Sequence, residues 1–181
     1  MGKLRNLESP RLTLIATTLE HIQVELEAPD QLSSLLNAAV SKAWPTGEYD
    51  RDAMEFFRGC FVQGGEAVEG WYGWYAVRPA DTESSRALVG AGGYFGPADP
   101  AGAVEIGYSV LPEWQRRGYA SEIVRMLVAR AFTFDAIKQV NAHTTAANPA
   151  SIAVLRRCGF IEAGVAREPG LVRFETRRPA G

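Results

Sequence analysis

The spacing of hydrophobic and polar positions changes along this chain, and each spacing predicts one kind of element. Alternating or continuous apolar runs, rich in β-branched and aromatic side chains, predict strands over residues 11–14, 71–77, 87–95, 104–111, 139–144 and 171–176. Apolar residues three and four positions apart predict helices over residues 18–28, 49–61, 120–132 and 148–155. Polar turns between these runs complete a series in which three strands lie between the second and third helices, and strands and helices then alternate.

The helix over residues 120–132 follows a short basic turn, residues 115–120. Its apolar stripe falls at i, i+3, i+4, i+7, i+8, i+11 and i+12: Ala120, Ile123, Val124, Leu127, Val128, Ala131 and Phe132. A strand that passes through a Gly-containing turn into a helix presents free backbone N–H groups at the positive end of the helix dipole, which suits a pyrophosphate. A plain connection with solvated arginines is the alternative. Neither a Gly-Lys-Ser/Thr phosphate loop nor a G-x-G-x-x-G motif is present.

Two motifs that follow one another along the chain favour the interpretation of this turn as a phosphate-binding loop. The turn fits the pattern Gln/Arg-x-x-Gly-x-Gly/Ala at Gln115, Gly118 and Ala120. A second pattern, Asn-x-x-Ser…Leu-x-x-x-Gly-Phe, is fitted by Asn148, Ser151, Leu155, Gly159 and Phe160. With a strand between them, the two motifs resemble those of the GNAT superfamily of N-acetyltransferases, which use acetyl-coenzyme A.

The resemblance extends to one branch of that superfamily and implies a fold. Residues 90–95 and 104–108, with the opening at residues 7–14, are similar to the branch of ribosomal-protein N-terminal acetyltransferases. The implied fold is α+β (mixed α/β), with a mostly antiparallel, twisted sheet of about six or seven strands and about four helices, splayed at the cofactor cleft. One acyltransferase domain is expected over residues 1–181, with its motif-bearing core at about 87–160.

Composition and charge limit the function further. The chain has 181 residues, 46% of them apolar and 22% charged, which suits one globular domain. A net charge of −2 gives no basis for nucleic-acid binding, and no apolar run approaches a membrane span. Residues 1–6 carry no apolar signal core, and two cysteines without metal-ligand spacing predict neither a disulfide scaffold nor a metal site. A cytoplasmic enzyme without a metal is expected.

The resemblance implies where the acyl donor binds. In the family, a bulge splays one strand from the next, and the pantetheine arm pairs with the freed backbone before the pyrophosphate reaches the loop. The matching positions are Ser109, Val110, Leu111, Gln115, Arg116, Arg117, Gly118, Tyr119, Ala120, Ser121, Asn148 and Ser151.

Acetyl transfer to an amine requires an amine without its proton and a leaving thiolate. An α-amine has a pKa of about 7.7–8.0 and a lysine amine about 10.4, so some group in the protein or a chain of water molecules must take up the proton. Glu105, on the strand before the loop, is the candidate, as a base or as a substrate anchor. Many family members protonate the thiolate with a Tyr at the position of Leu155, which cannot donate. Ser151 matches the serine proposed for this role in the ribosomal-protein branch, although it also suits a helix-capping position.

The acceptor side is less specified. Trp44, Tyr94 and Glu105 are the candidate acceptor contacts, and most of the other aromatic residues are expected to pack in the core. A lone histidine at a strand end, His143, is expected to be structural or solvated.

These observations predict an N-acetyltransferase that moves an acetyl group from acetyl-coenzyme A to a primary amine by direct attack in a ternary complex. The acceptor is a protein N-terminus or a small amine, such as an amino acid, a polyamine or an aminoglycoside. Two alternatives stay open: a catalytically inactive acyl-coenzyme-A-binding or sensing module, for which Leu155 argues, and an ordinary nucleotide-binding domain, against which the missing phosphate-loop lysine argues. The oligomeric state, including a homodimer, is left open.

Overall fold

The computed structural model describes residues 6–47, 49–82, 84–164, 166 and 168–179. Within them, one eight-stranded sheet has the order β1-β2-β3-β4-β5-β6-β8-β7. All neighbouring strands are antiparallel except β5 and β6, which run parallel. Residues 1–5, which bear on the expected absence of a signal segment, lie outside the described residues.

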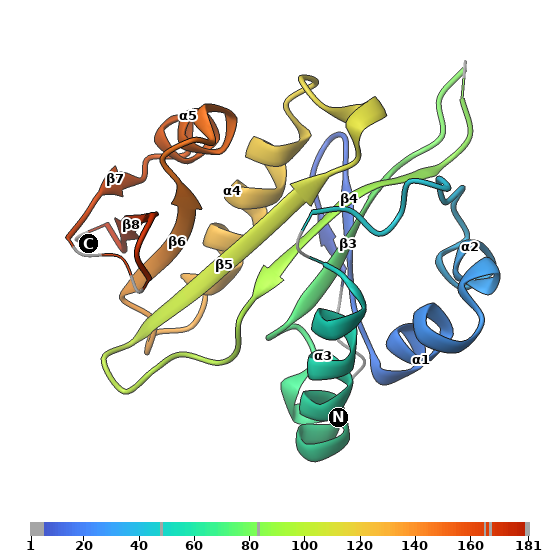
Figure 1. Ribbon diagram of the computed structural model, residues 1–181, viewed down its shortest axis with the longest axis horizontal. Helices are drawn as coiled ribbons and strands as arrows, with labels where there is room; N and C mark the ends of the chain where they lie inside the picture. The colour runs from blue at the N-terminus through green and yellow to red at the C-terminus, as the bar shows by residue number, and fades with distance from the viewer. Residues whose placement is uncertain (1–5, 48, 83, 165, 167, 180–181) are drawn as a thin grey trace.

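The strands and helices follow one another in the order that Figure 1 shows by colour. The first half holds β1 (Leu7–Glu8), β2 (Thr13–Ala16), α1 (Leu19–Glu27), α2 (Leu32–Leu36), α3 (Arg51–Gly64), β3 (Gly73–Arg78) and β4 (Ala87–Tyr94). The second half holds β5 (Ala103–Val110), α4 (Tyr119–Ala131), β6 (Gln139–Thr145), α5 (Pro149–Arg157), β7 (Ile161–Glu162) and β8 (Leu171–Arg177). Short 3₁₀ turns occupy Pro29–Gln31, Gly65–Val68 and Pro112–Trp114.

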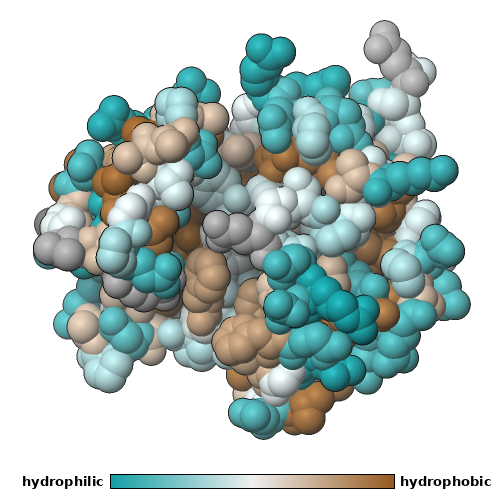
Figure 2. Space-filling model, viewed as in Figure 1, coloured by the Kyte–Doolittle hydropathy of each residue, from teal (hydrophilic) through white to brown (hydrophobic). Residues whose placement is uncertain are grey.

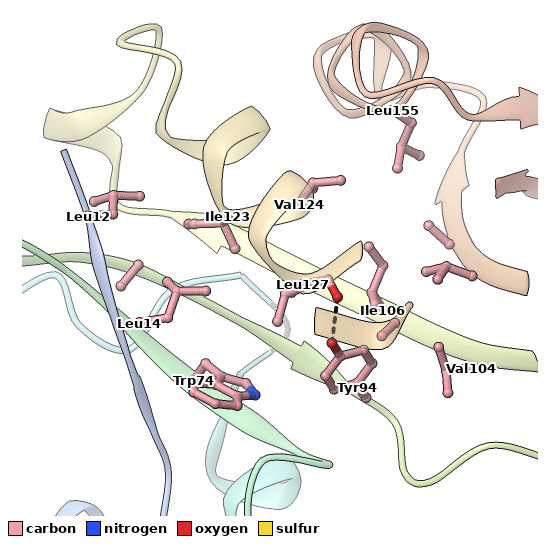
Figure 3. Close-up of a cluster of buried hydrophobic side chains, with 14 of the residues drawn as sticks. Leu12, Leu14, Trp74, Tyr94, Val104, Ile106, Ile123, Val124, Leu127 and Leu155 are labelled. Carbon is pink, nitrogen blue, oxygen red and sulfur yellow. Dashed lines mark hydrogen bonds between the residues drawn. The ribbon is translucent and has the colours of Figure 1, made fainter. Parts of the chain in front are cut away.

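Two layers of helices bury the two faces of the sheet. On one face, α4 supplies Ile123, Val124 and Leu127 to the main core, and α5 adds Leu155; all four side chains are fully buried (Figure 3). On the other face, Leu32 and Leu36 of α2 pack on β3 and β4, and α1 packs against α3. Apolar burial on both faces accounts for the continuous hydrophobic runs in β3 and β4.

The predicted fold class is confirmed, and the long elements lie where the hydrophobic spacing puts them, to within about three residues at each end. The sheet has eight strands rather than six or seven, because β1 and β7 are two-residue edge strands. Among the described residues there are five α-helices rather than four, because α2 has five residues. Elements this short contain less than one period of a hydrophobic pattern, so the sequence could not reveal them.

The parallel pair at the centre of the sheet separates halfway along its length. The register between β5 and β6 runs from Ala103↔Gln139 to Ile106↔Ala142 and stops there, although β5 continues to Val110 and β6 to Thr145. Figure 1 shows the two arrowheads diverging. This separation opens a gap in the sheet between residues 107–110 and 143–145, directly before the loop that leads into α4.

Candidate active site

The backbone of β5 presents unpaired polar groups to this gap. Glu105 O accepts from Phe95 N at 3.0 Å, and Leu111 N donates to Val89 O at 2.9 Å, so these residues direct their backbone groups toward β4. Because backbone groups alternate between the two sides of a strand, those of Tyr108 and Val110 point toward β6. The described register of β6 provides no partner for them. An extended ligand could therefore pair with β5 as an additional strand.

The three residues of β5 that the sequence suggested for donor binding differ in where their backbone groups point. Ser109 and Leu111 bond through their backbones toward β4, and the Ser109 hydroxyl donates to Thr46 O at 3.3 Å on the opposite face. Val110 faces the gap, but its carbonyl accepts from Gln115 Nε2 at 3.0 Å. Gln115 thus ties the loop to the end of the strand. The groups that stay available in the gap are the N–H and C=O of Tyr108 and the N–H of Val110.

The loop after β5 turns sharply into α4 through two residues with left-handed backbone. Arg116 has φ +59° and Gly118, the N-cap of α4, has φ +84°. No side chain caps this helix start among the described residues. The first N–H groups of α4, from Tyr119 onward, therefore have no intrahelical acceptor, and they lie at the positive end of the helix dipole. This geometry can bind a pyrophosphate.

A residue far away in the sequence supports the loop. The Arg11 guanidinium donates through Nη1 to Arg117 O at 2.8 Å and forms an ion pair with Glu122 in the first turn of α4. Glu122 also accepts from the Ser9 hydroxyl at 2.6 Å. The segment before β2 thus contacts the α4 N-terminus on both sides. The sequence pattern shows Arg11 only as part of a strand motif and does not reveal these contacts.

The start of α5 lies on the other side of the gap and carries a paired hydroxyl. Asn148 is the N-cap, and its Oδ1 accepts from Ser151 N at 3.0 Å, so its side chain has a structural role. The Ser151 hydroxyl lies 2.9 Å from the hydroxyl of Tyr108. Burial raises the pKa of Tyr108 to about 12, which keeps the phenol protonated at neutral pH. The two hydroxyls form a donor pair at the edge of the gap.

Glu105 lies on the opposite face of β5, where a histidine from β6 meets it. His143 Nδ1 is 3.0 Å from Glu105 Oε1, at ion-pair distance though not aligned as a hydrogen bond. The Glu105 side chain is 18% exposed and that of His143 10%, so solvent reaches both only in part. A cavity of about 230 Å³ adjoins Glu105 and is lined also by Phe95, Asp99 and Asn141. This face can receive a small amine-bearing group.

Trp44 lies in a loop next to the Glu105 face of the sheet, and a hydrogen bond holds its ring in place. Its indole N–H donates to Glu25 Oε1 at 2.6 Å, and the hydroxyls of Tyr49 and Tyr75 donate to Oε2 of the same carboxylate at 2.5 and 2.7 Å. Burial raises the pKa of Glu25, and the three donors oppose that rise. The loop that carries Trp44 reaches β5 at Ser109 through Thr46. Trp44 therefore fixes this loop, and the polar atom of its ring is already bonded.

The structure places Tyr94, the other aromatic acceptor candidate, in the core. Its side chain is 1% exposed, and its hydroxyl donates to Leu127 O at 2.6 Å (Figure 3). It belongs to the α4 side of the sheet, away from Glu105. An acceptor cannot reach it in this structure, so the expectation of an acceptor contact at Tyr94 is corrected to a packing role.

Most of the residues that the sequence singled out lie around the gap: loop residues 115–121, Val110 and Ser151. Glu105 lies on the other face of β5, beside the paired part of the two strands. Within the loop, the side chains of Tyr119 and Ser121 are buried. Sequence reasoning missed Tyr108 as a hydroxyl donor and His143 as the partner of Glu105. Their contacts cross between elements, so the pattern of either strand alone does not reveal them.

The described part of the chain contains no group of three or more His, Cys, Asp or Glu side chains that could hold a metal ion. None of its helices is long and apolar enough to span a bilayer. Hydrophilic and hydrophobic side chains are interspersed over the face that Figure 2 shows.

The chain is similar to known acetyltransferases in sequence and in fold. Residues 11–161 match the family described as acetyltransferase (GNAT) domain. An uncharacterized N-acetyltransferase of Bacillus subtilis (strain 168), YjdG, is 25% identical over 155 residues, which cover 86% of this chain and 89% of the relative.

Two solved structures share the fold at low identity. RimL, a ribosomal L7/L12 alpha-N-protein acetyltransferase in complex with coenzyme A, has a TM-score of 0.63 at 16% identity and covers 96% of this chain and 98% of its own. A spermidine N-acetyltransferase from Vibrio cholerae, in complex with coenzyme A and spermine, has a TM-score of 0.62 at 15% identity and covers 93% of this chain and 96% of its own.

Proposed function

Since this chain belongs to the GNAT family of N-acetyltransferases, which use acetyl-coenzyme A, we propose that it acetylates a primary amine by direct attack within a ternary complex. One observation carries the proposal: the gap between β5 and β6 opens directly into the loop at the α4 N-terminus. A ligand with an extended, hydrogen-bonding arm and a pyrophosphate matches both parts. The amine acceptor approaches from the face of Glu105.

On the donor side, the backbone of β5 binds and orients. We assign the pantetheine arm to the free groups of Tyr108 and Val110, and the pyrophosphate to the N–H groups of residues 116–121. Acetyl-coenzyme A supplies an activated acetyl group as a thioester. A free N–H in the gap, that of Val110 or Tyr108, is placed to stabilise the negative charge that develops on the thioester oxygen. Such preorganised donors are worth several kcal/mol in enzymes generally.

On the leaving side, Ser151 and Tyr108 provide the proton. Asn148 caps the helix by accepting a hydrogen bond from the Ser151 backbone N–H, so the Ser151 hydroxyl is not the capping group. That hydroxyl lies 2.9 Å from the Tyr108 hydroxyl. We assign Ser151 the proton donation to the departing thiolate, and Tyr108 the positioning of that hydroxyl. This pair replaces the donor that Leu155 cannot supply, because a leucine side chain has no proton to donate; Leu155 is fully buried in the core.

On the acceptor side, Glu105 supplies the negative charge that draws the amine and its proton into the site. The two structural neighbours named above acetylate a ribosomal-protein N-terminus and spermidine, so both classes of amine fit this fold. The cavity of about 230 Å³ beside Glu105 suits a group of a few heavy atoms next to the amine. A protein N-terminus with a small first residue and a small free amine are both small enough for this cavity.

Acetyl-coenzyme A is expected to stabilise the folded protein, whereas ATP and NAD are not, because the loop offers N–H groups without a base-reading partner. At a ligand concentration one hundred times the dissociation constant, the gain is about 2.7 kcal/mol. For a chain of this size that corresponds to a rise of roughly 5–10 °C in melting temperature. Thermal-shift measurements with each ligand check the result. An unchanged melting temperature in saturating acetyl-coenzyme A, with calorimetry also silent, contradicts the proposal.

Ser151→Ala is expected to lower turnover by about a hundredfold at pH 7, the low end for a general acid, because a thiolate leaves fairly well unaided. Tyr108→Phe removes only the neighbouring hydrogen bond and should cost about fivefold. Both losses should shrink toward pH 9, where the thiolate departs without a proton. Steady-state thiol release over pH 6–9 measures this. A Ser151→Ala enzyme with wild-type turnover at pH 6 would exclude Ser151 as the acid.

A further inference from the structure

Phe95 is a half-exposed aromatic residue beside the face of β5 that we assign to the acceptor. It is 51% exposed, and its backbone N–H donates to Glu105 O at 3.0 Å, which ties it to the strand that carries the carboxylate. It also lines the cavity of about 230 Å³ that adjoins Glu105. A single exposed apolar side chain is ordinary on a protein surface. The position of Phe95, rather than its exposure, therefore points to a function.

Gly107 gives the Phe95 ring its place against the sheet. A Cβ built at Gly107 lies 3.2 Å from two carbons of this ring, closer than ordinary van der Waals contact, so the ring packs on β5 where a side chain is missing. Gly107 shares the face of Glu105, because side chains alternate along a strand. It also follows Ile106, the last residue of β5 in register with β6. The ring therefore reaches from the cavity beside Glu105 to the residue at which the gap begins.

The charges around this cavity favour a cation. Asp99 and Glu105 line it together with Phe95, and its described lining contains no Lys, Arg or His. Asp99 Oδ1 accepts from the backbone N–H groups of Ala101 and Ala103 at 2.9 and 2.8 Å, which holds that carboxylate in place. An aromatic ring attracts a cation through its electron-rich face. An ammonium group in the cavity thus meets a ring and negative charge, whereas a carboxylate on the ligand meets two like charges.

We propose that Phe95 selects the acceptor: its ring binds the ammonium group of the acceptor beside Glu105, and the site favours primary amines that carry no carboxylate next to the amine. The proposal rests on the acetyl transfer inferred above, and it names the class of amine. Protein N-termini and alkyl amines belong to this class, whereas free α-amino acids do not. Phe95 binds the cation and takes no part in moving its proton.

Three unreactive probes test the selection without turnover. Choline carries a quaternary ammonium that cannot be acetylated on nitrogen, dimethylbutanol is its neutral isostere, and betaine adds a carboxylate to the same cation. In NMR titrations, we expect the wild type to bind choline about threefold to tenfold more tightly than either of the other two. Phe95→Leu should reduce the preference over dimethylbutanol about threefold, and Phe95→Tyr should retain it. No preference for choline in the wild type, or an undiminished one in Phe95→Leu, overturns the proposal.

Asp99→Asn tests the exclusion of carboxylates. The variant removes the negative charge but keeps a side-chain oxygen for the backbone N–H groups of Ala101 and Ala103. The preference for choline over betaine should fall about twofold to threefold, and what remains should depend less on salt. An unchanged preference contradicts the assignment of this selection to the charges of the cavity.

Kinetics show whether this binding serves acetyl transfer. With the best acceptor in a panel of amines, Phe95→Leu should raise KM about threefold to tenfold, with little change in kcat or in the dissociation constant of acetyl-coenzyme A. That pattern marks a residue that binds the acceptor equally before and during the reaction. Gly107→Ala, whose Cβ displaces the ring, should raise KM in the wild type and add little to Phe95→Leu.

The matched control is Phe56→Leu. Phe56 is 60% exposed on α3 and does not line this cavity, so its loss should change neither the binding of the probes nor KM. If the wild type releases thiol with amines and Phe95→Leu keeps the wild-type KM, the role of Phe95 is wrong. If the wild type binds acetyl-coenzyme A but no amine in a broad panel releases thiol, the proposed function fails instead, and the choline titration still decides whether Phe95 binds an ammonium group.

Discussion

Gly118→Val is expected to abolish the binding of acetyl-coenzyme A while leaving most of the fold in place. Gly118 has φ +84°, which a β-branched residue adopts at a cost of roughly 1–3 kcal/mol. A Cβ built there lies 3.3 Å from Arg11 Nη2, the atom that pairs with Glu122. The new side chain would therefore disturb Arg11, which supports the loop. It would also block close approach of a phosphate to the backbone.

Gly159→Val is the matched control for this loss. Gly159 has φ +83°, and a Cβ at that position meets no heavy atom within 4 Å. It follows α5 rather than preceding α4, so the variant incurs the same backbone strain without touching the phosphate loop. Calorimetric titration should show no binding for Gly118→Val and near-normal binding for Gly159→Val. Normal binding by Gly118→Val would mean that this loop is not the phosphate site.

The arginines of the loop should contribute less than Gly118 and in a different way. Arg117 lies over the Trp114 ring, with its guanidinium carbon 4.9 Å from the ring centre, and Arg116 holds the left-handed turn. Arg117→Ala should therefore weaken donor binding moderately, with a loss that shrinks as salt screens the charge. Titrations at low and high ionic strength separate this electrostatic term from the backbone effect at Gly118.

The loop and helix start that we assign to the donor could be recognised in the sequence because their determinants are local. The turn between a strand and an amphipathic helix lies within about thirty residues, and its chemistry follows from backbone groups that any sequence supplies there. Ser151 was found in the same way, since a motif fixes its place at the helix start. Its hydroxyl partner Tyr108 lies 43 residues earlier in the chain, and nothing in the pattern of β5 showed that the two hydroxyls meet.

The acceptor side could not be predicted in the same way, because it depends on packing between distant strands. Tyr94 and Trp44 were chosen for their aromatic character, which a core and a binding site both use. In the structure, the Tyr94 hydroxyl donates to Leu127 O, and the Trp44 indole N–H donates to Glu25 Oε1. His143 was expected to be structural because a single histidine on a strand has no partner in the sequence. Its contact with Glu105 arises where the parallel register of β5 and β6 ends, one residue after Ala142.

Glu105→Gln is expected to reduce the maximal rate of acetyl transfer by a hundredfold or more at pH 7, with little change in the affinity for acetyl-coenzyme A. The carboxylate lies on the face of β5 that we assign to the acceptor, whereas the backbone groups that we assign to the donor face the gap, so the two functions separate. A loss in kcat at constant donor affinity is the mark of a group that acts on the proton in the transition state. Glu162→Gln, an exposed carboxylate that pairs with Arg156 at 3.7 Å, is the matched control and should leave the rate unchanged.

The loss of rate in Glu105→Gln is expected to decrease as the pH rises. Below the pKa of the acceptor amine, about 7.7–8.0 for an α-amine, most of the acceptor is protonated and the rate depends on a group that removes that proton. Above it, the amine is already neutral, so the deficit of Glu105→Gln should be largest near pH 6 and should shrink toward pH 9. A lysine-like amine, with a pKa near 10.4, should keep the deficit large over that whole range. Because the donor affinity is the same in each case, only a role in proton uptake produces this dependence on the acceptor. Wild-type rates for Glu105→Gln at every pH would leave backbone positioning and water to carry the reaction.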